Sequence, residues 1–334
     1  MLVRALQTVA RCRESQRRGV EPRSAWVLAG RFLRRAGVMP TLHGRLFVRR
    51  GATATVWSRL RSGPLGGVTS GRGEPALIWA HGLGGSCAAD GARGLAALLD
   101  PEVLGRRVVR LDLRGHGTSA AAHDAERCAS QYEWREQAED MLQAARDLGG
   151  EEGAVVLGGE AAGAGIALQA AATAGCSAAG LVLMRPPAMW EARLPWQARY
   201  RWAAGVADEE GMAAKGLEEE AKFRLHRSLV GDEAHDCVLA EWRGMAAGAY
   251  AAALRGLAAS ETPSVDALRA LKQPTLILAV GGDPEHPVEA AEDLAALIPG
   301  AELAVAGSLG ELRETWARRL GEFLRRARLP DGLP

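Results

Sequence analysis

The chain has 334 residues, of which 48% are hydrophobic, with a net charge of +1 and a pI of about 7.7. This length suits one large α/β domain with an insertion rather than a minimal domain. The near-neutral charge gives no general reason to expect nucleic acid as a partner. Because no run of 18 apolar residues occurs, we expect no transmembrane segment.

The charge is unevenly distributed along the chain. Residues 1–50 carry twelve Arg and no Lys against Glu14 and Glu21, which is +10 and leaves −9 for the remainder. Two interpretations of this basic N-terminal extension stay open: a presequence for organelle import, or a basic helix pair packed beside the main domain. Trp26 and Phe32 fit a buried stripe as well as a targeting helix.

The cysteines are scattered, odd in number and without C-x-x-C spacing. This pattern suits a reducing compartment and argues against a disulfide framework or a zinc site. We therefore expect an intracellular, cytoplasmic protein that needs no metal and no cofactor. The five positions are Cys12, Cys87, Cys128, Cys176 and Cys237.

The pattern of apolar residues predicts a sheet that opens with a hairpin. Segments 42–48 and 54–60 read as two edge strands, and the Gly-rich segment 62–73 reads as a loop. After it, strand-like runs alternate with helical segments, which predicts a mostly parallel sheet covered on both faces. The expected strands are 76–80, 108–113, 154–157, 181–184, 274–280 and 301–306, and the expected helices are 132–148, 163–170 and 312–327.

Residues 186–264 break this alternation. They are helix-rich and hold no convincing strand, which predicts a helical cap inserted above the sheet. The cap's tryptophans either pack its helices on the body or line a ligand pocket. They are Trp190, Trp196, Trp202 and Trp242.

The stretch 154–170, AVVLGGEAAGAGIALQA, joins a buried strand to a tightly packed helix through a glycine turn. Glycines two residues to either side of the turn let a strained backbone present one side chain, as in the G-x-S-x-G elbow that holds a nucleophile. Here the glycines are Gly159 and Gly163, and the middle position is Ala161. A methyl group cannot attack a carbonyl.

Four motifs follow one another: HGLGGS at 81–86, DLRGHGTS at 112–119, GEAAGAGIALQ at 159–169 and PTLILAVGGDPEHP at 274–287. They resemble the oxyanion loop, the D-x-R-G-x-G-x-S turn, the GESAGA elbow and the acid-bearing loop of the α/β-hydrolase superfamily, with its esterases, lipases and lactonases. The resemblance covers about 41–324. It implies an α/β-hydrolase fold with a mostly parallel eight-stranded sheet, helices on both faces and a helical cap. The implied division is 1–40 as extension, 41–185 and 265–327 as core, 186–264 as cap and 328–334 as tail.

In this family the catalytic residues follow the chain order Ser, Asp or Glu, then His. The resemblance places the nucleophile at Ala161 and the acid at Asp283. It places the histidine near Gly310, and no histidine occurs between there and the C-terminus. Two of three members are missing, so the triad is degenerate and the chain is expected to be a pseudoenzyme.

Other residues are weighed as substitutes. A register shifted by one residue would make Glu160 a carboxylate nucleophile. His286 is either a replacement base or an exposed loop histidine, and the latter is favoured. The remaining candidates, His81, His116, Ser86, Cys87 and Ser308, are interpreted as loop residues.

The resemblance implies that the oxyanion hole persists, because its donors are the backbone N–H groups of Leu83 and Ala162. We therefore expect a non-catalytic subunit that binds a small carbonyl or carboxylate ligand, or a protein partner. Two alternatives stay open. One is a lyase, isomerase or similar enzyme with Asp283 or Glu160 as acid or base. The other is an ester or lactone hydrolase with an unidentified nucleophile.

Overall fold

The structure is a computed structural model of the whole chain. Much of the expected basic extension, the C-terminal tail and part of the expected cap lie outside the residues that it describes. Those described are 39–40, 46–50, 53–60, 63–71, 76–92, 98–122, 128–148, 155–173, 176–217, 236, 239–240, 242–307 and 309–327.

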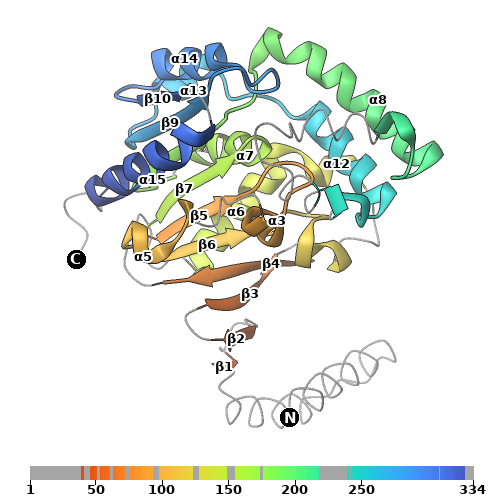
Figure 1. Cartoon of the computed structure of the whole chain (residues 1–334), viewed down its shortest axis with the longest axis horizontal. Coiled ribbons are helices and arrows are strands. Elements are labelled where there is room, and N and C mark those ends of the chain that lie inside the picture. The colour runs from red at the N-terminus through yellow and green to blue at the C-terminus, as the bar shows by residue number, and fades with distance from the viewer. Residues whose placement is uncertain are drawn as a thin grey trace.

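A single sheet of ten described strands runs through the molecule in the order β1-β2-β3-β4-β6-β5-β7-β8-β9-β10 (Figure 1). The strands from β6 to β10 pair in parallel, and those from β1 to β4 pair antiparallel. Their bounds are β1 Met39–Pro40, β2 Leu46–Arg50, β3 Thr53–Leu60, β4 Gly63–Ser70, β5 Ala76–Ala80, β6 Val108–Leu111, β7 Val155–Glu160, β8 Gly180–Met184, β9 Thr275–Val280 and β10 Glu302–Ala306.

The expected count of eight strands is too low, although the mostly parallel α/β class is confirmed. The additional strands are β1 and β4, and β4 occupies most of the segment expected to be a loop. Its glycines explain the difference. A Cβ on Gly67 would lie 2.4 Å from the carbonyl oxygen of Arg110, so glycine there lets β4 approach β6 closely.

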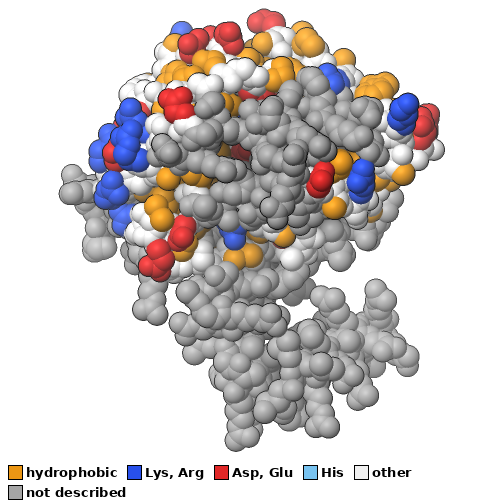
Figure 2. Space-filling model, viewed as in Figure 1, with side chains coloured by type: hydrophobic (Ala, Val, Ile, Leu, Met, Phe, Trp, Pro, Cys, Tyr) orange, Lys and Arg blue, Asp and Glu red, His pale blue; other side chains and the backbone are white. Residues whose placement is uncertain are grey.

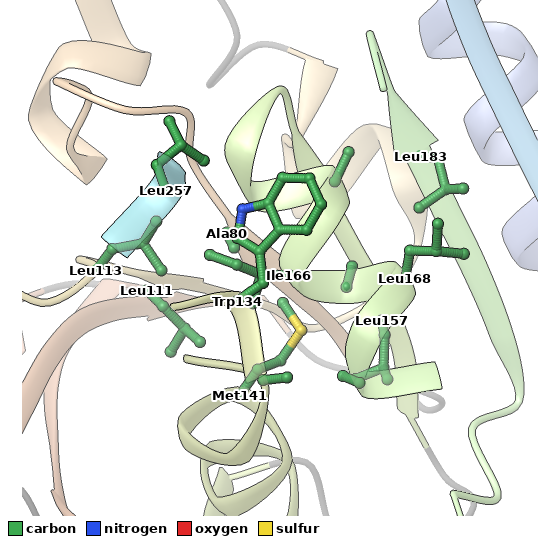
Figure 3. Packing of buried hydrophobic residues seen from close by; sticks show 14 of the residues in the cluster. Ala80, Leu111, Leu113, Trp134, Met141, Leu157, Ile166, Leu168, Leu183 and Leu257 are labelled. Carbon is green, nitrogen blue, oxygen red and sulfur yellow. The ribbon is translucent and has the colours of Figure 1, made fainter. Parts of the chain in front are cut away.

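Helices cover both faces of the sheet, and successive residues of β5 belong to different cores. Ile78 and Ala80 lie in one cluster with α6 and α7, where Trp134 and Ile166 pack (Figure 3). Leu77 and Trp79 lie in a second cluster, with residues of α15. The helices of the body are α3 Cys87–Ala92, α5 Pro101–Leu104, α6 Trp134–Leu148, α7 Ala162–Ala171, α13 Val265–Arg269, α14 Val288–Leu297 and α15 Leu309–Arg326, with the 3-10 helices η1 Gly117–Ala122 and η2 Ala129–Tyr132.

Helix α15 is amphipathic, and this determines which of its sides faces the sheet. Its buried side includes Trp316, Leu320 and Phe323, and its outer side carries exposed arginines. Blue side chains gather at this end of the molecule in Figure 2. Arg326 of α15 pairs with Glu302 of β10 at 2.7 Å.

Between β8 and β9 the described chain is helical: η3 Trp190–Arg193, α8 Leu194–Glu210 and α12 Ala247–Ala259. Helices α8 and α12 lie side by side at one end of the sheet (Figure 1). The cap tryptophans differ in exposure, since Trp242 is 3% exposed and stacks edge-on against Tyr250, whereas Trp202 is 51% exposed. Treating 186–264 as a separate cap remains a proposal.

In the part of the chain that the structure describes, no helix is both long and apolar enough to cross a bilayer.

Candidate functional site

The turn between β7 and α7 is strained at Ala161. This residue has φ 54° and ψ −117°, a backbone conformation that residues other than glycine rarely adopt. Its N–H donates to the carbonyl of Met184 at 3.0 Å. The strained residue of the turn is therefore Ala161, and Glu160 is the last residue of β7.

The two flanking glycines allow the strand and helix to meet. A Cβ on Gly159 would lie 2.4 Å from the carbonyl carbon of Gly163, and one on Gly163 would lie 2.1 Å from the carbonyl oxygen of Ala80. Neither contact is tolerable, so this spacing of glycines is a packing requirement of the turn.

Beside the turn lies Arg185, a residue that sequence reasoning did not single out. It follows β8 directly, with φ 49°. Its Nη1 lies 2.8 Å from Glu160, while Nε and Nη2 lie 2.7 and 2.6 Å from Oδ2 of Asp283. The sequence did hold a signal, because an arginine directly follows the apolar run 181–184. In the structure Met184 pairs with Glu160 of β7, which places Arg185 beside the end of that strand.

Asp283 accepts hydrogen bonds at both oxygens. Oδ1 accepts from the N–H groups of Glu285 and His286, and Oδ2 faces Arg185 and Nδ1 of His286, the latter at 3.1 Å. Burial alone would raise the pKa of Asp283, but the hydrogen bonds and charges of His286 and Arg185 hold it well below its usual range. The carboxylate is thus ionised and already engaged.

The structure corrects the expectation that His286 is an exposed loop residue. It is 7% exposed, because the turn that Asp283 closes with backbone N–H bonds folds the imidazole back against the same carboxylate. Its Nδ1 also lies 3.3 Å from Nη2 of Arg185. A buried cluster of four charged or titratable side chains results: Glu160, Arg185, Asp283 and His286.

The cluster is held mainly by Arg185. Burial by itself would lower the pKa of its guanidinium, but the charges of Glu160 and Asp283 raise it above the ordinary value. Arg185 is therefore a permanent cation between two carboxylates.

The two other candidate histidines bond to backbone. His81 contacts the carbonyl of Gly82 through Nδ1 and accepts from the N–H of Leu113 at Nε2. His116 accepts from the N–H of Gly84 at Nε2 and contacts the carbonyl of Arg114 through Nδ1. Burial lowers the pKa of His116 to about 3, so it is neutral at physiological pH. Both rings connect the loop at 81–86 to the turn at 112–119.

The candidate nucleophiles of the oxyanion loop are also engaged. Ser86 accepts from the N–H of Ala89 at 3.0 Å. Burial, together with the charge of Asp112, raises the pKa of the Cys87 thiol well above its usual range, so little thiolate forms at neutral pH. Gly310 lies in the first turn of α15, and Ser308 is outside the described residues.

The backbone donors of Leu83 and Ala162 stand close to the strained turn. Both residues are half-buried, and a Cβ on Gly82 would lie 3.2 Å from that of Ala161. Among the described residues, neither N–H has a protein acceptor. Nor do the described His, Cys, Asp and Glu residues form a group of three or more that could hold a metal ion.

With ten strands, the elbow and its flanking loops in place, the chain belongs to the α/β-hydrolase superfamily. The family model described as "alpha/beta hydrolase fold" matches residues 75–309. A comparison with curated protein sequences found no match.

Solved structures with this fold include hydrolases, esterases and a lactonase. A hydrolase from Pseudomonas aeruginosa is 19% identical with a TM-score of 0.65, over 81% of this chain and 98% of that one. A thermophilic esterase from Thermogutta terrifontis is 25% identical with a TM-score of 0.62, over 82% and 98%. The enol-lactonase from Burkholderia xenovorans is 19% identical with a TM-score of 0.64, over 81% and 100%. These likenesses support the fold.

Proposed function

We propose that this chain is a catalytically inactive α/β-hydrolase that binds a small molecule through a carbonyl or carboxylate oxygen. The observation that carries the proposal is the state of the elbow: its strained position holds Ala161, and Arg185 engages the acid Asp283. Acyl transfer in this fold needs a hydroxyl, a base that takes its proton and a carboxylate that orients the base.

Each of the three roles is compromised. The methyl of Ala161 has no proton to lose and no lone pair to offer. His81 and His116 use both ring nitrogens on backbone groups. Nδ1 of His286 lies between Asp283 and the guanidinium of Arg185, which competes for the same carboxylate. Asp283 neutralises an arginine, which weakens its hold on any imidazolium that would form.

Binding does not need these side chains. The N–H groups of Leu83 and Ala162 are main-chain donors, and Ala162 opens α7, whose positive dipole end favours an oxyanion. A carboxylate or the carbonyl of an ester would accept from both. The aligned esterases and lactonase act on such groups by name, which supports this ligand class.

The ligand is tested by removing one donor without disturbing the turn. Leu83 is the second residue of a turn closed by the N–H of Gly85 and the carbonyl of Gly82 at 3.0 Å, and Gly84 has φ 74°. This is the type II pattern, in which proline is favoured at the second position. Leu83→Pro therefore deletes the N–H, and Leu83→Ala is the matched control that keeps it.

The assay is calorimetric titration with short-chain carboxylates, acetate to hexanoate, and their methyl esters, alongside p-nitrophenyl ester turnover. We expect the wild type to bind these ligands without turning them over. Leu83→Pro should lower the binding affinity about tenfold or more, as expected for the loss of a hydrogen bond to a charged group. Leu83→Ala should keep the wild-type affinity. Equal affinity in the two variants would contradict the proposed ligand site. Turnover well above background, or labelling of the wild-type chain by a fluorophosphonate, would favour the enzyme alternative.

A second candidate function is that of a complex or scaffold subunit. Leu194 and Trp202 are 58% and 51% exposed on α8, which favours a protein partner on that helix. Co-purification of a stoichiometric partner from the native source, lost in Trp202→Ser, would support it.

A further inference from the structure

A cavity separate from the elbow lies between η3, the start of α8 and the end of α12. Its volume is about 330 Å³, near the lower end of the range for small-molecule sites. None of its residues belongs to the elbow or to the Arg185 cluster. The lining residues are Trp190, Arg193, Gln197, Ala259, Ser260, Glu261 and Thr262.

Arg193 is a buried cation without a carboxylate partner among the described residues. It is 2% exposed, its Nη2 donates to the carbonyl of Leu257 at 2.7 Å, and its guanidinium carbon lies 4.0 Å from the ring centre of Trp134. Its Nε has no acceptor within the described part of the chain. Burial lowers the pKa of Arg193 to about 10, so it remains charged at neutral pH.

This arrangement differs from that of two other largely buried arginines of the body. Arg114 forms a bidentate pair with Asp140, and Arg185 contacts two carboxylates. An uncompensated buried charge is costly, and a ring face with one carbonyl offsets only part of that cost. Arg193 thus brings a cation without a described carboxylate partner to the lining of the cavity.

The start of α8 adds to the positive potential. Arg193 is its N-cap residue, no side chain caps the helix, and its first turn holds no acidic residue. Over 17 residues the helix presents a positive dipole end at this place. The exposed acid that lines the cavity is Glu261, which would oppose an anion.

We propose that this cavity binds an oxyanion, the carboxylate or phosphate group of a small molecule, with Arg193 as its counter-charge. Gln197 and Thr262 line the same cavity and supply neutral donors to the rest of the ligand. The site is separate from the one at the elbow, so a Leu83→Pro chain retains it.

The test follows the Arg193 Nε–H resonance of the full-length chain labelled with ¹⁵N-arginine. The resonance is assigned by its absence in Arg193→Met, which keeps an apolar stem over Trp134. Acetate and inorganic phosphate are added in separate titrations at constant ionic strength. Arg201→Met is the matched control, since it removes an exposed arginine of α8 that does not line the cavity.

We expect a saturable shift of this resonance in the wild type and in Arg201→Met. By calorimetry, affinity falls about tenfold or more in Arg193→Met. In Glu261→Gln it rises, because a repelling charge is gone. Saturation by phosphate alone identifies a phosphorylated ligand, and saturation by acetate identifies a carboxylate.

Three results would overturn the proposal: shifts that stay linear for both anions, affinity unchanged in Arg193→Met, or weaker binding in Glu261→Gln. If Arg193→Met fails to fold, calorimetry on the wild type and the Glu261→Gln comparison still decide the question.

Discussion

Replacing Arg185 with methionine should destabilise the protein in a pH-dependent way. Arg185→Met keeps a long apolar side chain but removes the cation that contacts Glu160 at 2.8 Å and Asp283 at 2.6 Å. These two residues are 2% and 3% exposed, so both carboxylates would be left in a poorly solvated place. Breaking one buried pair costs about 3–5 kcal/mol, and two stranded carboxylates put the loss at neutral pH near the upper end, about 5 kcal/mol.

The sign of the pH dependence follows from Asp283. Its pKa is lowered in the folded wild type, so its contribution to stability is fully present above the unfolded value of about 3.9 and is lost as the pH falls toward the folded value. In Arg185→Met the burial is opposed only by His286 and the backbone N–H of Glu285, and the pKa of Asp283 rises. Protonation of Asp283 then removes the cost of a buried, unpaired carboxylate in the variant. The difference in the free energy of unfolding between variant and wild type should therefore shrink as the pH falls from 7 to 4.

The assay is urea unfolding at pH 7 and pH 4 for wild type, Arg185→Met and the control Arg318→Met. The control breaks an exposed pair with Glu322, whose members are 58% and 39% exposed, and should cost less than about 1 kcal/mol. A loss below about 1 kcal/mol in Arg185→Met would refute the reasoning, as would an equal loss at both pH values.

Two further predictions concern glycine and strain. Gly165→Ala would place a Cβ 2.5 Å from the ring of Trp134 and should destabilise the protein by about 1–3 kcal/mol. Gly205→Ala in α8 meets nothing within 4 Å and should stabilise the protein by up to about 1 kcal/mol. Thermal unfolding distinguishes the two variants, and equal shifts of their unfolding midpoints would contradict the packing described for Gly165. Ala161→Gly removes backbone strain worth about 1–3 kcal/mol against a smaller entropic loss of about 0.4–1 kcal/mol, so the unfolding midpoint should rise slightly. A marked fall would show that the methyl of Ala161 is needed for packing.

Local sequence patterns were sufficient for the parts of the fold that local physics determines. The glycines around Ala161 are required by close backbone contacts, and the alternation of apolar strands and helices gives the parallel sheet. The strand β4 was missed because its glycines, which permit its approach to β6, resemble a loop in composition.

The chemistry of the elbow depended on contacts between distant segments. Arg185 contacts Asp283 although the two residues are 98 positions apart in the sequence. The local sequence around neither residue predicts this contact. The burial of His286 follows from backbone bonds to Asp283 that only the folded loop reveals. A charged residue directly after a buried strand was the one signal that could have drawn attention to Arg185.

The most direct test of a dismantled site is kcat/KM of Ala161→Ser for p-nitrophenyl acetate, with mass-spectrometric detection of fluorophosphonate labelling at position 161. The strained turn and the backbone donors would then surround a hydroxyl that has no established base, because Asp283 is engaged by Arg185. The account predicts kcat/KM at least about a thousandfold below the range of about 10⁴–10⁸ M⁻¹s⁻¹ typical of enzymes, and no labelling. Rates within that range, abolished by adding His286→Gln, would show that His286 serves the elbow as a base and would contradict the account.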